Sequence, residues 1–191
     1  MEELRGQEGR KPVQYPKISE ELLNRLKTDQ DMREKNLDDD SMWDENIDLD
    51  NTEAMKRIVE EIGWPTVSKV GKEASGAAWL LVQHADHDPA FQQRCLELIK
   101  SESGNEVERR NIAYLEDRVR VNTGRPQVYG TQFLETRDEE TNQRVVAYGP
   151  KPIEDFERID ERRALMGLEA FEEYRKAITG RYYPHLLDEG E

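Results

Sequence analysis

The stretch that decides the fold runs from Ala74 to Pro89 and reads ASGAAWLLVQHADHDP. Its first part, residues 74–82, is apolar and predicts a buried helix, whereas residues 83–88 carry Gln, His and Asp side chains. Titratable groups at the end of a buried helix cost stability unless they are paired, so unpaired ones are expected to serve a function. The stretch therefore predicts both a core helix and a candidate site at the end of that helix.

The apolar part predicts a helix over about residues 72–85 with a narrow face of small residues. Ala74, Ala77 and Ala78 lie on that face, which allows another helix to approach closely. Asp88 followed by Pro89 is typical of an N-cap and the first residue of a new helix. The polar residues His84 to Asp88 are therefore expected at a corner between two helices.

Apolar periodicity outside this stretch predicts further helices over residues 20–35, 51–62, 106–121, 160–166 and 169–178. Residues 127–134 and 144–148 are typical of strands, and the polar segment 135–143 between them predicts a β-hairpin over 127–148. We expect a mainly α fold: a single helical domain, residues 18–178, with one β-hairpin packed against it. Residues 1–17 are expected to form a disordered tail, and residues 179–191 a loose one.

An acid-rich segment spans residues 36–51 and is expected to be a solvated loop. The spacing of its acids resembles a calcium-binding loop only loosely, because the central Gly and the final Glu are missing. The single cysteine, Cys95, shares a helical spacing with apolar residues and is expected to be buried.

Composition excludes several classes of function. The chain has 191 residues, of which 37% are charged and 35% hydrophobic, and its formal net charge is −14. That charge argues against nucleic acid and against anionic membrane surfaces as partners. Nothing in the sequence resembles a signal peptide or a stretch long enough to span a membrane, so we expect a cytoplasmic protein.

Several short motifs occur together in a characteristic order: QHAD at 83–86, YLEDRV at 114–119 and PQVYGTQ at 126–132. GWP at 63–65, DERR at 160–163 and the residues Asp29, Gln30 and Arg33 accompany them. Together, over about residues 18–175, they resemble a bacterial domain-of-unknown-function family. The resemblance implies positions equivalent to His84 and Asp86 but not His87, and it implies no activity.

Polar residues on otherwise buried faces are the candidates for a site. If they converge on one cavity, they supply an imidazole, carboxylates, a guanidinium and amide or hydroxyl groups, which suit acid/base chemistry or a polar ligand. His84 is the expected general acid or base, because imidazole titrates near neutrality, and Asp86 or Asp117 is expected to orient it. Arg118 or Arg33 is expected to hold an anionic group of the substrate. The expected catalytic residues are His84, Asp86, Asp117 and Arg118; the expected substrate-binding residues are Arg33, Gln83, Tyr114, Gln127, Tyr129, Thr131 and Gln132.

The leading hypothesis is a small soluble enzyme of hydrolase, lyase or isomerase type that acts on a small polar molecule without an organic cofactor. No nucleophile elbow, phosphate-binding loop or dinucleotide fingerprint occurs in the sequence. One alternative is a divalent metal bound by His84, His87 and Asp88. Another is a non-catalytic ligand-binding or protein-interaction module that uses the same polar residues. In a third, these residues are only helix caps and buried pairs.

Overall fold

The computed structural model describes residues 13–38, 43–137, 144–150 and 152–182. The chain divides into two compact units, residues 1–84 with 103–107 and residues 85–102 with 108–191. The mainly helical class is confirmed. Of the two predicted tails, residues 1–12 and 183–191 lie outside the described residues, whereas Pro16 and Lys17 already belong to the first helix and 179–182 to the last. The single helical domain over residues 18–178 stays a prediction.

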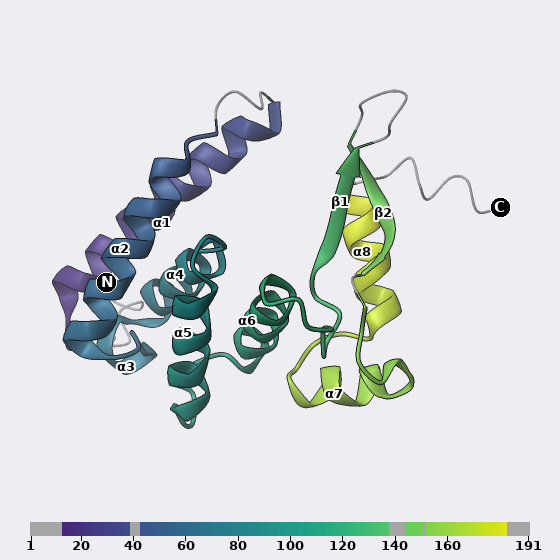
Figure 1. The fold of residues 1–191 in the computed structure, drawn as a ribbon. Helices are drawn as coiled ribbons and strands as arrows, with labels where there is room; N and C mark the ends of the chain where they lie inside the picture. The colour runs from purple at the N-terminus through teal and green to yellow at the C-terminus, as the bar shows by residue number, and fades with distance from the viewer. Residues whose placement is uncertain (1–12, 39–42, 138–143, 151, 183–191) are drawn as a thin grey trace, which may run out of the picture. The chain divides into compact units, whose positions relative to one another are not determined.

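The first unit consists of α1 (Pro16–Asp38), α2 (Glu45–Ile62), α3 (Val67–Val70) and α4 (Lys72–Gln83). Helix α4 packs against each of the other three, and α1 also packs against α2 (Figure 1). Ala77 and Ala78 are fully buried on α4, which confirms the small-residue face. Because these side chains are short, neighbouring helices can approach the α4 backbone closely.

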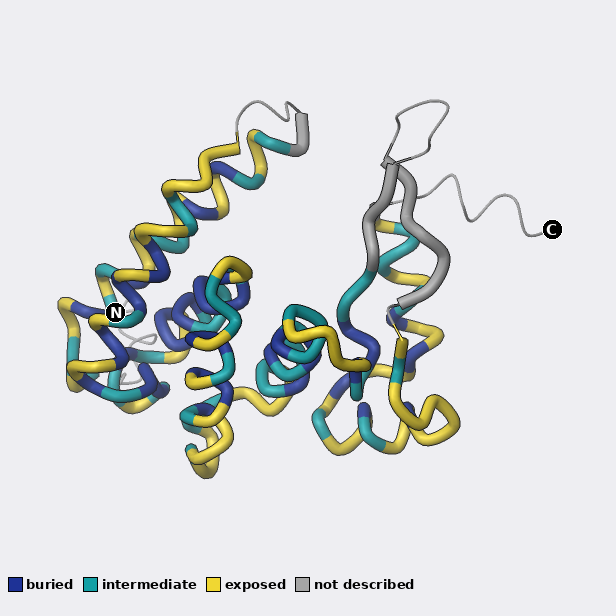
Figure 2. The backbone as a smooth tube through the Cα atoms, in the orientation of Figure 1, coloured by how far each residue is buried: buried dark blue, intermediate teal, exposed yellow. Residues whose placement is uncertain are grey.

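The core of this unit follows the predicted periodicity. Met55, Ile58, Val59 and Ile62 of α2 are buried at a spacing that places them on one face of the helix. Figure 2 shows buried and exposed positions alternating along α1 and α2, as expected for helices with one covered face. Trp64, which follows α2, is almost completely buried.

The acid-rich segment is mostly helical, so the prediction of a loop over 36–51 is wrong. Helix α1 continues to Asp38, and α2 begins at Glu45, after an N-cap at Asp44 whose carboxylate accepts the N–H of Asn46 at 3.0 Å. Acidic side chains in a first helical turn are stabilised by the helix dipole, so an acidic run can start a helix. Residues 39–42 lie outside the described part of the chain.

The second unit contains α5 (Pro89–Ser101), α6 (Arg109–Asn122), η2 (Phe156–Arg158), α7 (Ile159–Leu165) and α8 (Phe171–Tyr182). Asp88 caps α5 as predicted, accepting the N–H of Phe91 at 3.0 Å. Helix α5 packs against α6, and α7 packs against α8. Cys95 of α5 is fully buried, and burial raises the pKa of its thiol to about 12, which suits a core residue.

Two strands, β1 (Phe133–Arg137) and β2 (Arg144–Pro150), pair antiparallel with Glu135 opposite Val146. A bulge interrupts the register between Phe133 and Glu135. The predicted first strand, 127–134, is wrong over residues 127–132. These form a loop whose one ladder contact is a parallel bridge between Gln127 and Ile153. Segment 138–143 lies outside the described residues, and packing of the hairpin against the helices stays a prediction.

No helix in the described part of the chain is both long and apolar enough to cross a membrane.

Candidate active site at the end of helix α4

His84 directly follows the last residue of α4 and closes the helix. Its N–H bonds to the carbonyl oxygens of Leu80 and Leu81, and its backbone leaves the helical path. The imidazole reaches α1, where its Nδ1 lies 2.9 Å from Oδ1 of Asp29. The histidine side chain is 14% exposed, and that of Asp29 is fully buried. The polar end of the apolar helix thus forms a specific pair with a residue 55 positions earlier.

Asp29 accepts hydrogen bonds from three residues. Besides His84, Gln30 Nε2 donates to Oδ2 at 2.7 Å, and Arg33 Nε lies 3.2 Å from Oδ1. Burial alone would raise the pKa of Asp29, but the hydrogen bonds from His84 and Gln30 and the charge of Arg33 outweigh it. The pKa of Asp29 therefore lies below its ordinary value. Asp29 is thus a buried carboxylate held in its charged form beside an imidazole.

Arg33 links Asp29 to a second carboxylate, Asp48 on α2. Its Nη2 donates to Asp48 Oδ1 at 2.6 Å, and its guanidinium carbon lies 4.8 Å from the ring centre of Trp43. Burial raises the pKa of Asp48 and repulsion by Asp29 adds to the rise, so attraction by Arg33 offsets only part of it. Since Arg33 pairs with both carboxylates, its predicted role in binding an anionic substrate would require breaking those pairs.

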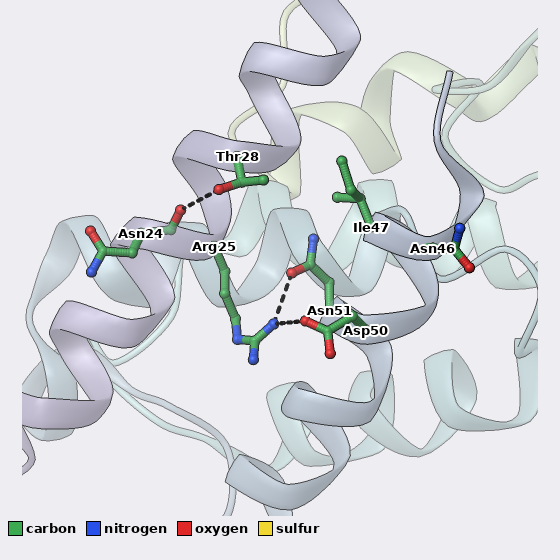
Figure 3. A pocket seen from close by; sticks show the side chains of 7 residues that line it. All are labelled: Asn24, Arg25, Thr28, Asn46, Ile47, Asp50 and Asn51. Atoms are coloured by element: carbon green, nitrogen blue, oxygen red, sulfur yellow. Dashed lines mark hydrogen bonds and ion pairs between the residues drawn. The ribbon is translucent and has the colours of Figure 1, made fainter. Parts of the chain in front are cut away.

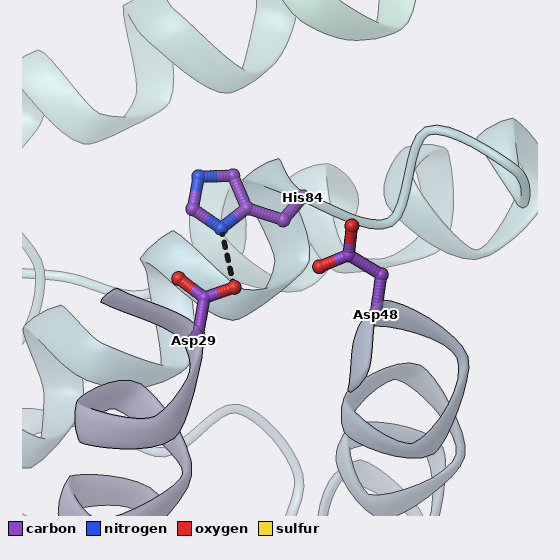
Figure 4. A group of neighbouring side chains, drawn as sticks. All are labelled: Asp29, Asp48 and His84. Atoms are coloured by element: carbon purple, nitrogen blue, oxygen red, sulfur yellow. Dashed lines mark hydrogen bonds and ion pairs between the residues drawn. The ribbon is translucent and has the colours of Figure 1, made fainter. Parts of the chain in front are cut away.

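The orientation of the imidazole determines what this cluster can do. In Figure 4 the Nδ1 edge of His84 faces Asp29, while the other ring nitrogen, Nε2, points away from both carboxylates. In neutral His84, a proton on Nδ1 would be donated to Asp29, and the lone pair would lie on Nε2. A histidine whose tautomer is fixed in this way by a carboxylate can take and return a proton at its outer nitrogen.

The same three residues are also the possible metal ligands that the described structure brings together. Oxygens of Asp29 and Asp48 and a ring nitrogen of His84 lie within 4.8 Å of one another. This differs from the predicted metal set, because neither His87 nor Asp88 belongs to the group. Asp88 instead caps α5. Two oxygens and one imidazole nitrogen would suit a first-row transition metal or zinc.

Asp86 and Arg118, both predicted catalytic residues, lie together in the second unit. Asp86 Oδ1 accepts from Asn122 Nδ2 at 2.8 Å and from Gln92 Nε2 at 3.3 Å, and Arg118 Nε lies 3.4 Å away. Asp86 thus joins the start of α5 to the end of α6. The sequence suggested Asp86 or Asp117 as the group that orients His84, but the residue bonded to the imidazole is Asp29.

Asp117 holds the loop over residues 128–131. Its two carboxylate oxygens accept the N–H groups of Val128, Tyr129 and Thr131 at 2.7 to 3.2 Å, together with the Thr131 hydroxyl at 3.0 Å. The side chain is fully buried, and burial raises its pKa, which these hydrogen bonds only partly offset. These contacts are those of a structural anchor, and they leave the predicted catalytic role of Asp117 without support.

The carbonyl groups of the same loop are bound by two neighbouring arginines of α7. Arg162 Nε donates to the carbonyl oxygen of Val128 at 2.9 Å, and Arg163 Nη1 donates to that of Tyr129 at 2.6 Å. Arg163 is completely buried, and its guanidinium carbon lies 4.9 Å from the ring centre of Tyr174. The loop is therefore held through its amides on one side and its carbonyls on the other.

Most of the predicted substrate-binding residues belong to this loop or to its support. The Gln127 side chain both donates to and accepts from the backbone of Gln132, at 2.9 and 2.8 Å. Gln132 Nε2 donates to Thr131 Oγ1 at 3.1 Å. Tyr114 makes an edge contact with Tyr174, with ring centres 6.2 Å apart. Gln83, by contrast, is buried at the end of α4.

Sequence reasoning missed the role of two residues in the cluster around His84. Asp29 was noted in the family motif with Gln30 and Arg33, without an assigned role, and Asp48 was expected in a loop. Recognising Asp48 as part of a helix would have placed it one turn before Thr52 and on the face that covers α1 and α4.

The comparisons with known proteins give a family and no activity. A model described as a family of unknown function (DUF6624) matches residues 16–185. The chain belongs to this family, which confirms the resemblance to a family of unknown function. Searches of curated proteins and of solved structures found no match.

Proposed function

We propose that this member of a family of unknown function is an enzyme that performs acid/base chemistry on a small polar substrate, with His84 as the general acid or base. The observation that carries the proposal is the pair between His84 Nδ1 and the buried Asp29 carboxylate, 2.9 Å apart. Buried titratable pairs of this kind rarely improve stability and are enriched at functional sites.

The chemistry follows from the two ring nitrogens. Nε2 of neutral His84 takes a proton from a substrate or from a water molecule, and the imidazolium that forms is stabilised by the Asp29 carboxylate. The same Nε2 then returns the proton to the leaving group or to the carbon that completes the reaction. Arg33 supports this cycle by keeping Asp29 ionised, since its charge lowers the pKa of that carboxyl. Such a cycle occurs among hydrolases, lyases and isomerases.

The reactivity of Nε2 can be tested before any substrate is known. Diethyl pyrocarbonate acylates neutral imidazole nitrogens, and the chain has only three histidines, so mass spectrometry can follow each one. We expect His84 to be modified although its side chain is only 14% exposed, and to react more slowly in Asp29→Asn. His87 provides the internal control. A His84 that stays unmodified while His87 reacts would contradict the proposal.

Identification of the substrate can use binding. Small polar metabolites are screened by the thermal stabilisation that they give to the protein, and compounds that stabilise it are tested for turnover. For an enzyme of the proposed kind, His84→Gln retains binding but loses turnover by about 100-fold or more. A ligand that binds without any turnover by the parent protein would favour the alternative, a non-catalytic binding module.

A bound divalent metal is the competing proposal, and the cluster of Asp29, Asp48 and His84 is the observation that favours it. Arg33 argues against it, because its guanidinium already pairs with both carboxylates and would be repelled by a cation. Titration with Zn²⁺ and Mn²⁺ separates the two readings. The acid/base proposal predicts no saturable stabilisation that depends on Asp48. A stabilisation that Asp48→Asn abolishes would support the metal.

A further inference from the structure

A pocket of about 310 Å³ lies between α1 and α2, outside the His84 cluster. Helix α1 contributes Asn24, Arg25 and Thr28, and helix α2 contributes Asn46, Ile47, Asp50 and Asn51 (Figure 3). None of these residues belongs to the group of Asp29, Asp48 and His84. The lining is thus made of amides, one hydroxyl, one ion pair and a single apolar side chain.

Asn51 is the distinctive member of this lining. The residue is only 4% exposed, and among the described residues its Nδ2 has no hydrogen-bond partner. Its Oδ1 accepts from Arg25 Nη1 at 3.3 Å, which fixes the orientation of the amide, because a flipped amide would set two donors against each other. Figure 3 shows the nitrogen pointing away from Arg25, towards the side where Thr28 and Ile47 lie.

A buried donor without an acceptor costs about 1 to 3 kcal/mol, and such groups in native proteins call for an explanation. A ligand that supplies the acceptor would remove this cost. The charge in the pocket is already balanced, because Arg25 Nη1 donates to Asp50 Oδ2 at 2.6 Å. A neutral ligand therefore fits better than an ion. The mixture of donors and acceptors suits hydroxyl groups, which both donate and accept.

We propose that the α1–α2 pocket binds a small neutral polyhydroxylated molecule, such as a monosaccharide or a cyclic polyol, with Asn51 Nδ2 donating to one of its hydroxyl oxygens. Asp50 accepts from a second hydroxyl of the ligand. Ile47 covers part of the carbon skeleton. Full contact with Asn51 requires neighbouring side chains to move, since its amide nitrogen is buried.

The test follows the side-chain amide signals of the asparagines by ¹H–¹⁵N NMR while D-glucose, D-ribose and myo-inositol are added one at a time. At least one of these probes is expected to shift the Asn51 signal saturably. Asn51→Leu is expected to weaken that binding about tenfold or more, which is about 1.4 kcal/mol. The lost nitrogen has no partner among the described residues, and Arg25 Nη1 keeps its bond to Asp50, so the variant should keep the melting temperature of the parent or exceed it.

Two matched controls separate binding from folding. Asn36→Leu alters an asparagine of α1 that also has a buried amide atom without a partner among the described residues, but it lies outside the pocket and should leave affinity unchanged. Thr28→Val and Thr179→Val each remove a hydroxyl that bonds to the carbonyl four residues earlier, and only Thr28 lines the pocket. Thr28→Val alone should weaken binding. No saturable shift with any probe, or equal losses in pocket and control variants, would overturn the proposal.

Discussion

At the scale of single residues, folding shifts the pKa values of the two carboxyl groups near His84, Asp29 and Asp48, in opposite directions. Folding lowers the pKa of Asp29, so the stability that its charged form contributes is present above the ordinary value of 3.8 and is lost as the pH falls through the lower folded value. Folding raises the pKa of Asp48, so its charged form costs stability, and this cost disappears as the pH falls through the raised value towards 3.8.

Two isosteric variants test this difference in sign. The advantage in unfolding free energy of the parent over Asp29→Asn should shrink as the pH falls below 3.8. For Asp48→Asn the trend is opposite: the unfolding free energy of the parent should rise relative to that of the variant as the pH falls towards 3.8. Urea unfolding at a series of pH values measures both. Parallel trends for the two variants would show that the cluster does not have the charges described.

Outside the cluster around His84, substitution of Asp117 should also cost stability. Both of its oxygens accept backbone N–H groups, so Asp117→Asn places an amide donor against them and should cost about 2 to 4 kcal/mol. Asp160→Asn is the control, because among the described residues Asp160 Oδ1 accepts the N–H of Phe171, and an amide oxygen can replace it. Equal losses in chemical denaturation would mean that Asp117 is not the anchor of the loop.

At the scale of elements, the loop over residues 128–131 depends on a glycine. Gly130 has φ of 64°, and a Cβ there would lie 2.7 Å from the Phe171 ring and 2.8 Å from Ile153. Gly130→Ala should therefore add a steric clash to backbone strain and cost about 3 kcal/mol. Gly124→Ala, at φ of 75° with no atom within 4 Å, carries only the strain and should cost about 1 kcal/mol. Similar melting temperatures for the two variants would contradict this packing.

Elements with an apolar period were predictable, and those fixed by polar contacts were not. The spacing of Met55, Ile58, Val59 and Ile62 predicted the buried face of α2, but the first turns of that helix carry acids and have no such period. The β-like residues at 127–132 predicted a strand, whereas Asp117 accepts the amides that a strand would use in its ladder. Local pattern gave no indication of that competing acceptor.

The candidate site, like the fold, was predictable only in part. The polar end of α4 pointed to His84, because titratable groups interrupt an apolar run there. Its partner was expected nearby in sequence or on α6, whereas it is Asp29, 55 residues away on α1. Tertiary pairing of this kind leaves no periodic signal in a single sequence.

At the scale of the whole molecule, the chain passes between the two units three times, after residues 84, 102 and 107. The short segment 103–107 belongs to the first unit, where the carbonyl oxygen of Glu106 accepts the N–H of Val67 at 3.1 Å. Unfolding of the second unit would release both ends of this segment. We therefore expect the two units to unfold together, as the predicted single domain would.

Hydrogen exchange in Gly130→Ala tests this cooperativity. If the units unfold together, the most protected amides of α4 in the first unit should lose as much protection as those of α6 in the second. Loss of protection confined to residues 108–182 would show that the second unit unfolds on its own, and the prediction of a single domain would then be wrong.

The measurement that tests the central claim most directly is the ¹⁵N NMR spectrum of the His84 imidazole at a pH where the ring is neutral. The pair with Asp29 predicts that the proton is on Nδ1 and the lone pair on Nε2, and that Asp29→Ala loses this preference. A neutral ring protonated on Nε2 in the parent would contradict the account, because the nitrogen facing away from Asp29 would then have no lone pair to accept a proton.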